Sequence, residues 1–168
     1  MKRFLNILLV VVMLSFSASS FAATSLIFND NGAADELTAW LNNTWPSGGK
    51  NFVLHLYCTN VTPADTDVAS TYTECSGGGY SAITLTNGSW TVSSVGSIYQ
   101  AAYAKQTWTF TGTLTTNGTI YGYYITDQAS TPVVVWSQLF NAPMTPANNG
   151  DQLSITPVLQ ASHGTPSS

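Results

Sequence analysis

The sequence predicts an all-β protein, an antiparallel β-sandwich or jelly-roll-like fold with one short N-terminal helix. After Lys50, short segments alternate between apolar and polar residues, which is the period of a half-buried strand. Asn-Gly and glycine-rich turn signals separate these segments at hairpin-like spacing. Several such segments in about 145 residues are typical of one sandwich or flattened-barrel domain.

Residues 1–23 have the pattern of a secretory signal peptide. Lys2 and Arg3 precede an apolar run from Leu5 to Phe16, and small residues follow at the expected cleavage site. An uncleaved anchor is the alternative, but the run is short for a bilayer span and no stop-transfer charges follow it. We therefore predict a secreted protein, extracellular or at the cell surface, without membrane insertion after cleavage.

Charged residues make up only 7% of the chain, with four Lys and Arg against eight Asp and Glu. Cleavage would remove Lys2 and Arg3 and leave two lysines against eight acids, a net charge of −6. A basic surface for nucleic acid or anionic lipid is therefore absent. Sparse charge also tolerates close packing between copies, although many secreted β proteins share this composition.

Two segments precede the strands. Residues 24–32 form an N-terminal extension whose apolar residues Leu26, Ile27 and Phe28 fit a strand that could be donated to a neighbouring copy. The predicted domain, residues 33–160, then begins with a helix in which tryptophans and leucines recur at helical spacing before a Pro-Ser-Gly-Gly stop.

The strands follow in order. Asn87-Gly88 predicts a hairpin between the second and third of them, and Pro157 places the last at a sheet edge or ends its pairing. Residues 161–168 are predicted to be a flexible tail. The predicted strands cover residues 52–57, 80–85, 90–92, 106–114, a Tyr/Ile-rich part of 116–126 after an Asn117-Gly118 turn, 133–140 and a final segment containing Leu153 and Ile155.

Several segments in this order resemble a family of small β-rich structural proteins from the virion surface of tailed bacteriophages. They include "LHLYCTNVTPADTDVASTYTE", "GGGYSAITL", "QTWTFTG", "TIYGYYITD" and "APMTPANNGDQLSITPVLQ", over roughly residues 53–160. The resemblance implies a structural role without catalytic residues. The signal peptide and the two cysteines depart from the family pattern. An exported relative is similar in architecture to secreted pilus subunits, which complete a neighbour's sheet with an N-terminal strand.

Cys58 and Cys75 are the two cysteines of the chain. In an oxidising compartment an even count predicts one disulfide, which would stabilise the fold by about 3 kcal/mol by closing the loop. An intermolecular bridge is the alternative. A redox role is disfavoured because the chain has no Cys-x-x-Cys motif.

Asp65, Asp67 and Glu74, between or beside the cysteines, could supply oxygens to a calcium ion. Their spacing lacks the glycine and terminal glutamate of a dedicated calcium loop. The alternative is a turn at residues 63–65 in which side chains bond to the backbone.

Catalytic chemistry finds little support. His55 lies in an apolar strand and His163 in the predicted tail, and no Gly-x-Ser-x-Gly motif or His/Cys metal cluster is present. We therefore expect no enzyme activity and no cofactor.

Several aromatic residues could form a sugar-binding platform or could instead pack in the core. They are Trp90, Tyr99, Tyr103, Tyr121, Tyr123 and Tyr124. Four asparagines head N-glycosylation sequons, Asn42, Asn60, Asn87 and Asn117.

These observations predict a structural subunit of an extracellular filament or coat whose partners are copies of itself, joined through strand edges. A secreted carbohydrate-binding module that recognises glycans and a phage virion decoration protein are the alternatives.

Overall fold

The computed structural model describes residues 26–28, 51–95 and 98–161. These residues form antiparallel sheets with one short 3-10 helix, η1 (Ala69–Thr71), and this confirms the predicted all-β fold. The finer assignment to a sandwich or jelly roll stays a prediction. The strands are β1 (Leu26–Phe28), β2 (Phe52–Tyr57), β3 (Ile83–Leu85), β4 (Thr91–Val95), β5 (Ile98–Ala102), β6 (Gln106–Thr109), β7 (Ile120–Asp127), β8 (Val134–Met144), β9 (Gln152–Ile155) and β10 (Val158–Ala161).

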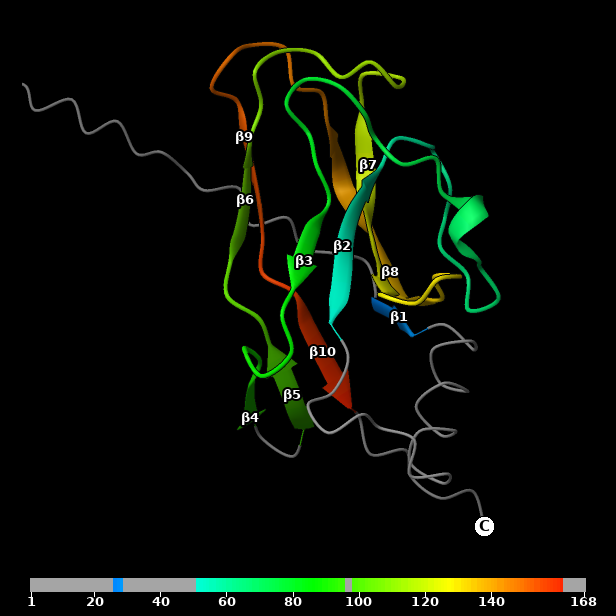
Figure 1. Ribbon diagram of the computed structural model, residues 1–168, viewed down its shortest axis with the longest axis vertical. Coiled ribbons are helices and arrows are strands. Elements are labelled where there is room, and N and C mark those ends of the chain that lie inside the picture. The colour runs from blue at the N-terminus through cyan, green and yellow to red at the C-terminus, as the bar shows by residue number, and fades with distance from the viewer. Residues whose placement is uncertain (1–25, 29–50, 96–97, 162–168) are drawn as a thin grey trace, which may run out of the picture.

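The largest sheet has five strands in the order β1-β8-β7-β2-β3 (Figure 1). Its centre consists of β2, β7 and β8, whose side chains are mostly buried. Leu54, Leu56 and Ile125 point to the main core, while the alternate residues His55 and Tyr124 lie on the opposite face. Both faces of this sheet are therefore covered where β2 and β7 pair.

Two smaller sheets, β10-β5-β4 and β6-β9, continue into one another along the chain. The Tyr103 N–H donates to the Pro157 carbonyl at 2.9 Å, between the β5–β10 pairs and the β6–β9 pairs. The register places residues 103–105 opposite residues 156–157, so one strand carries an extra residue, as in a β-bulge. Pro157 interrupts pairing as predicted, and β10 resumes it.

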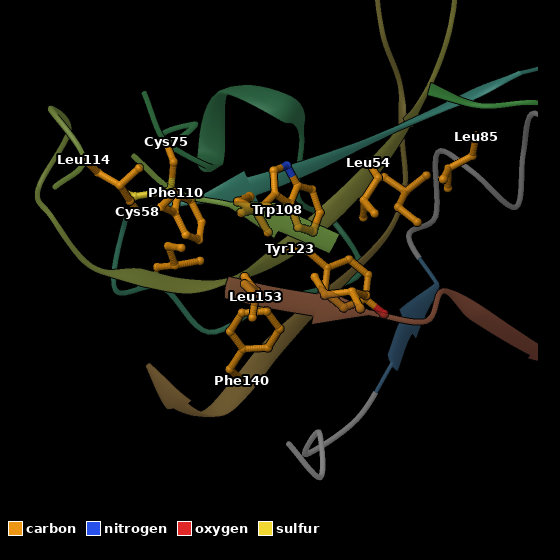
Figure 2. Packing of buried hydrophobic residues seen from close by; sticks show 14 of the residues in the cluster. Leu54, Cys58, Cys75, Leu85, Trp108, Phe110, Leu114, Tyr123, Phe140 and Leu153 are labelled. Atoms are coloured by element: carbon orange, nitrogen blue, oxygen red, sulfur yellow. A yellow bond between two sulfur atoms is a disulfide. The ribbon is translucent and has the colours of Figure 1, made fainter. Parts of the chain in front are cut away.

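The main core lies where the five-stranded sheet faces β6 and β9. Figure 2 shows Trp108 and Phe110 of β6 and the following turn close to Leu153 of β9 and Tyr123 of β7. Burying each such side chain fully is worth about 1.5–3 kcal/mol. The buried members of this core are Leu54, Leu56, Cys58, Cys75, Leu85, Trp108, Phe110, Leu114, Ile120, Tyr123, Ile125, Val135, Trp136, Phe140, Leu153 and Ile155.

The predicted hairpin at Asn87-Gly88 is wrong. The dipeptide does form a turn, in which the Ser89 N–H reaches the Thr86 carbonyl at 3.3 Å. However, β3 before it pairs with β2, and β4 after it pairs with β5 in another sheet. The turn therefore carries the chain from one sheet to another, because β3 finds its partner in the strongly apolar β2.

Two further predictions fall wholly or partly outside the described residues. The expected helix near the start of the 33–160 domain lies outside them. Ala161, the first residue of the predicted tail 161–168, instead ends β10 and pairs with Tyr99, and residues 162–168 lie outside the described residues. Across the described part of the chain, no helix has the length and apolar character needed to span a membrane.

Candidate functional site

Cys58 and Cys75 form a disulfide, with their Cα atoms 5.1 Å apart. This confirms the predicted bond within one chain. Both cysteines are buried in the main core, and backbone hydrogen bonds of 2.8 Å and 2.9 Å pair the same two segments, from Cys58 N to Thr73 O and from Cys75 N to Leu56 O. The disulfide thus closes the loop of residues 59–74, called here the closed loop, onto the end of β2.

The closed loop folds over the outer face of the five-stranded sheet, beside β2 and β7 (Figure 1). Four rings lie there one after another, the first three stacked and the last tilted, and we call them the ring column: His55, Tyr124, Tyr72 and Tyr57. The ring centroids are separated by 4.6 Å, 4.9 Å and 5.0 Å in that order. Only Tyr72 comes from the closed loop, so its ring holds the loop against the sheet.

The Tyr72 hydroxyl sits between two partners, Asp67 Oδ2 at 2.7 Å and Ser137 Oγ at 2.8 Å. A carboxylate only accepts, so the phenol donates to Asp67 and the Ser137 hydroxyl donates to the phenol oxygen. Desolvation by burial raises the pKa of Tyr72, with Asp67 adding to the effect and Ser137 opposing it. Both ends of this hydrogen-bonded chain are satisfied, and Ser137 is fully buried.

His55 of β2 connects the sheet to Glu74, the last residue of the closed loop. Its Nδ1 lies 3.0 Å from Glu74 Oε1, and its Nε2 lies 3.1 Å from Thr126 Oγ1. The Tyr80 hydroxyl donates to the same Glu74 oxygen at 2.8 Å and accepts from the Leu56 N–H at 3.0 Å. These hydrogen bonds hold the pKa of Glu74 below its ordinary value, His55 contributing most, against a smaller opposite effect of burial.

Glu74, His55 and Thr126 have the order of an acid, a histidine and a hydroxyl that nucleophilic enzymes use. Thr126, however, is only 2% exposed, so a substrate cannot reach its hydroxyl. The arrangement acts as a structural link between β2, β7 and the closed loop. Sequence reasoning placed His55 in a strand but missed its partners, which stand 19 and 71 positions away.

Among the described residues, no group of three His, Cys, Asp or Glu side chains is placed to hold a metal ion, and the three acids of the calcium hypothesis lie in different settings. Asp67 is taken up by Tyr72 and by the Ala64 N–H at 2.8 Å, while Glu74 faces His55 and Tyr80. Asp65 is exposed. The turn of the alternative interpretation lies at residues 64–67, where the Asp67 carboxylate accepts from the Ala64 N–H and the Asp67 N–H donates to the Ala64 carbonyl at 3.2 Å.

Aromatic residues do not form an exposed platform within the described residues, where Val68 and Val92 are the exposed large hydrophobics. Trp90 and Tyr103 pack together at 5.1 Å, against the core. Tyr123 is in the main core, Tyr124 is in the ring column, and Tyr121 packs against it half-buried. For Tyr99 the structure describes only the backbone, in β5.

The sequon asparagines occupy different settings. Asn60 and Asn87 are exposed. Asn117 is exposed too, but its side-chain amide donates to the Cys58 carbonyl at 3.2 Å. Asn42 lies outside the described residues.

β1 is the segment that sequence analysis assigned to a neighbouring copy. In the structure it pairs with β8 of its own chain, Leu26 with Gln138, Ile27 with Ser137 and Phe28 with Trp136. It forms the edge of the five-stranded sheet (Figure 1). A donated β1 would therefore have to leave this place and take the equivalent one in another copy.

Comparisons with protein-family models, with curated proteins and with solved structures found no match for this chain. The resemblance to phage virion-surface proteins stays a prediction.

Proposed function

We propose that the protein is a structural subunit of an extracellular filament or coat, in which copies are joined through β-strand edges. The observation that carries the proposal is the position of β1. It is an edge strand of three residues, paired with β8 alone among the described strands, and residues 29–51 separate it from β2. A strand attached in this way can make the same contacts inside its own chain or in a neighbour.

Exchange of β1 replaces each lost backbone contact with an identical one. Closure within the chain competes at an effective concentration of millimolar order, so exchange is favoured where copies are concentrated. Each copy both gives and receives a strand, and this head-to-tail rule produces a filament or ring.

Three other features support an extracellular structural role. The buried Cys58–Cys75 disulfide fits an oxidising environment. The signal peptide predicted from residues 1–23 would export the chain. Among the described residues, the hydroxyl of the acid–histidine–hydroxyl arrangement belongs to the buried Thr126, which favours a structural role for this arrangement over chemistry.

The test uses two variants that each add one cysteine to the native disulfide, Leu26→Cys and Gln138→Cys, at positions opposite one another in the β1–β8 register. Directly opposite residues have Cβ atoms about 4.5–5.5 Å apart, close to what a disulfide needs. The two purified variants are mixed at high concentration, oxidised mildly and run on a non-reducing gel. Trans pairing predicts a cross-linked heterodimer.

The matched control mixes Leu26→Ser with Gln138→Cys and should give no heterodimer. The variant carrying both cysteines should form covalent ladders if exchange occurs and a cross-linked monomer if it does not. A mixture that stays monomeric at every concentration, with single particles by negative-stain microscopy, would refute the proposed role of β1.

A further inference from the structure

The described sheet edges differ in how well they are protected. Side chains from β6 and the β5–β6 connection occupy backbone groups on either side of β3: the Trp108 indole N–H donates to the Ser81 carbonyl at 2.8 Å, and the Thr86 N–H donates to the Tyr103 hydroxyl at 3.0 Å. The β9–β10 edge is interrupted by Pro157, which has no N–H. These features discourage pairing with another chain.

β4 has none of these protections. Within the described residues it pairs only with β5, in an uninterrupted register from Thr91 opposite Ala102 to Val95 opposite Ile98. Its sequence, Thr-Val-Ser-Ser-Val, contains no proline, no charge and no bulge. Thr91, Val92 and Ser93 are exposed, and Val92 is 70% exposed. A strand of this kind leaves half of its backbone groups available on the outer side.

The distribution of charge indicates what would pair there. No charged residue occurs between Glu74 and Lys105, a stretch that includes all of β4 and β5, and β10 is uncharged as well. The carboxylates of Asp65, Asp67 and Glu74 belong to the closed loop, on the other side of the molecule from β4 (Figure 1). Two copies of this acidic chain can thus meet along β4 while their carboxylates stay apart.

We infer that β4 is a second self-association edge, at which β4 of another copy adds antiparallel and makes one continuous sheet across two molecules. The contact is related by a two-fold axis, so the same edge is used on both sides. It covers Val92 and pairs backbone groups that otherwise face water. This inference rests on the proposed self-assembly and adds a lateral contact to the head-to-tail exchange of β1.

A contact of this size is weak by itself, because adding one short strand buries less area than a standard stable interface. Its effect grows when many copies are already joined in a row, since each further pairing is then intramolecular. The expected product is the side-by-side pairing of filaments, or a weak dimer where filaments do not form.

The test compares Val92→Lys and Val92→Glu with Val68→Lys in the full chain. Val68 is the other large exposed hydrophobic residue, 46% exposed and located in the closed loop, so it controls for the loss of a surface valine and for the added charge. Sedimentation velocity measures dimerisation, and negative-stain microscopy measures lateral pairing. We expect either Val92 variant to weaken dimerisation by about tenfold or more, because two like charges meet across the two-fold axis, and Val68→Lys to leave it unchanged.

Mixing Val92→Lys with Val92→Glu should restore dimers, because opposite charges then face one another. Wild-type dimerisation in Val92→Lys, an equal loss in Val68→Lys, or no recovery in the mixture would each overturn the β4 assignment. The Leu26→Cys and Gln138→Cys cross-link reports separately on β1, so it should survive Val92→Lys. Failure of one interface is therefore distinguishable from failure of the other.

Discussion

Gly122 lies under the ring of Tyr57, in space that a side chain would need. A Cβ atom at this position would meet the Gln138 carbonyl oxygen and the Tyr57 hydroxyl and ring. The Tyr57 hydroxyl donates to that same carbonyl at 3.3 Å, across β7 and onto β8. The glycine therefore allows Tyr57 of β2 to reach across β7 to β8 and to end the ring column there.

Replacing Gly122 with alanine should lower the free energy of unfolding by about 1–3 kcal/mol, because the methyl group overpacks a site bounded by backbone. Denaturant unfolding followed by tyrosine fluorescence measures the change. Gly88→Ala is the control: its surroundings are open and only its left-handed backbone opposes a side chain, at a cost of about 1–2 kcal/mol. A Gly122→Ala protein as stable as wild type would contradict the close packing.

Glu74 makes the stability of the fold depend on pH in the acidic range. Its pKa is lower in the folded chain than its ordinary value of 4.5, because His55 and Tyr80 hydrogen-bond to the carboxylate. The unfolded chain binds a proton on Glu74 more readily than the folded chain does. The ionised Glu74 therefore contributes its full stabilisation of the fold above the ordinary pKa, and this stabilisation is lost as the pH falls through the lowered pKa of the folded chain. Glu74→Gln should therefore reduce the fall in stability below about pH 5.

Unfolding midpoints in urea at a series of acidic pH values test this expectation. Asp65→Asn, which removes an exposed carboxylate from the same loop, controls for the change in net charge. Because Glu74 remains partly exposed, solvent screens its interaction with His55. The diagnostic quantity is therefore the slope of unfolding free energy against pH, not the size of the stability change. Parallel pH profiles for wild type and Glu74→Gln would contradict the role of the His55–Glu74 pair.

Among the elements, the sequence predicts those whose signal is local. Residues 52–57 are strongly apolar, and β2 has these bounds. β5 escaped prediction because "IYQAA" has neither clear alternation nor many β-branched residues, and it is a strand because both β4 and β10 pair with it. Tertiary pairing also overrode the hairpin signal at Asn87-Gly88. A strand whose pairing depends on residues far away in the sequence shows little local signal of it.

In the candidate site, too, the features with a local signal could be predicted and those that depend on distant residues could not. The Cys58–Cys75 bond could be predicted because a count of two cysteines, in a chain predicted to be secreted, leaves one simple pairing. The ring column could not, since it depends on Tyr72 of the closed loop meeting Tyr124 of β7. Likewise, β1 was recognised as an isolated apolar segment, but its partner strand β8 is more than a hundred residues away.

The closed loop as an element should depend on its disulfide. Replacing Cys58 and Cys75 together with alanine should cost about 2–5 kcal/mol of unfolding free energy, because the loop regains freedom in the unfolded chain. The native loop also becomes easier to lift from the ring column, so near-ultraviolet circular dichroism of the tyrosines should weaken. Tyr72→Phe, which keeps the ring but loses the bonds to Asp67 and Ser137, is the matched comparison. An unchanged spectrum and stability in the double variant would contradict this account.

At the scale of the whole molecule, self-association must overcome the repulsion between acidic copies. The chain carries eight acidic residues against four basic ones, and the predicted loss of residues 1–23 would widen the excess. Both proposed contacts consist of backbone pairing along uncharged strands, β1 with β8 and β4 with β4 of another copy. Neither contact needs an ion pair, so the only long-range electrostatic force between copies is repulsive.

Assembly should therefore strengthen, not weaken, as salt is raised from about 0.01 M to 0.15 M, where the screening length falls from about 30 Å to 8 Å. Sedimentation velocity at fixed protein concentration across this range measures the change. Val92→Lys provides the comparison, because its dimers suffer an added local repulsion and should gain more from salt than wild type. Assembly that weakens steadily with salt would show that ion pairs hold the copies together, and would exclude uncharged strand edges as the main contact.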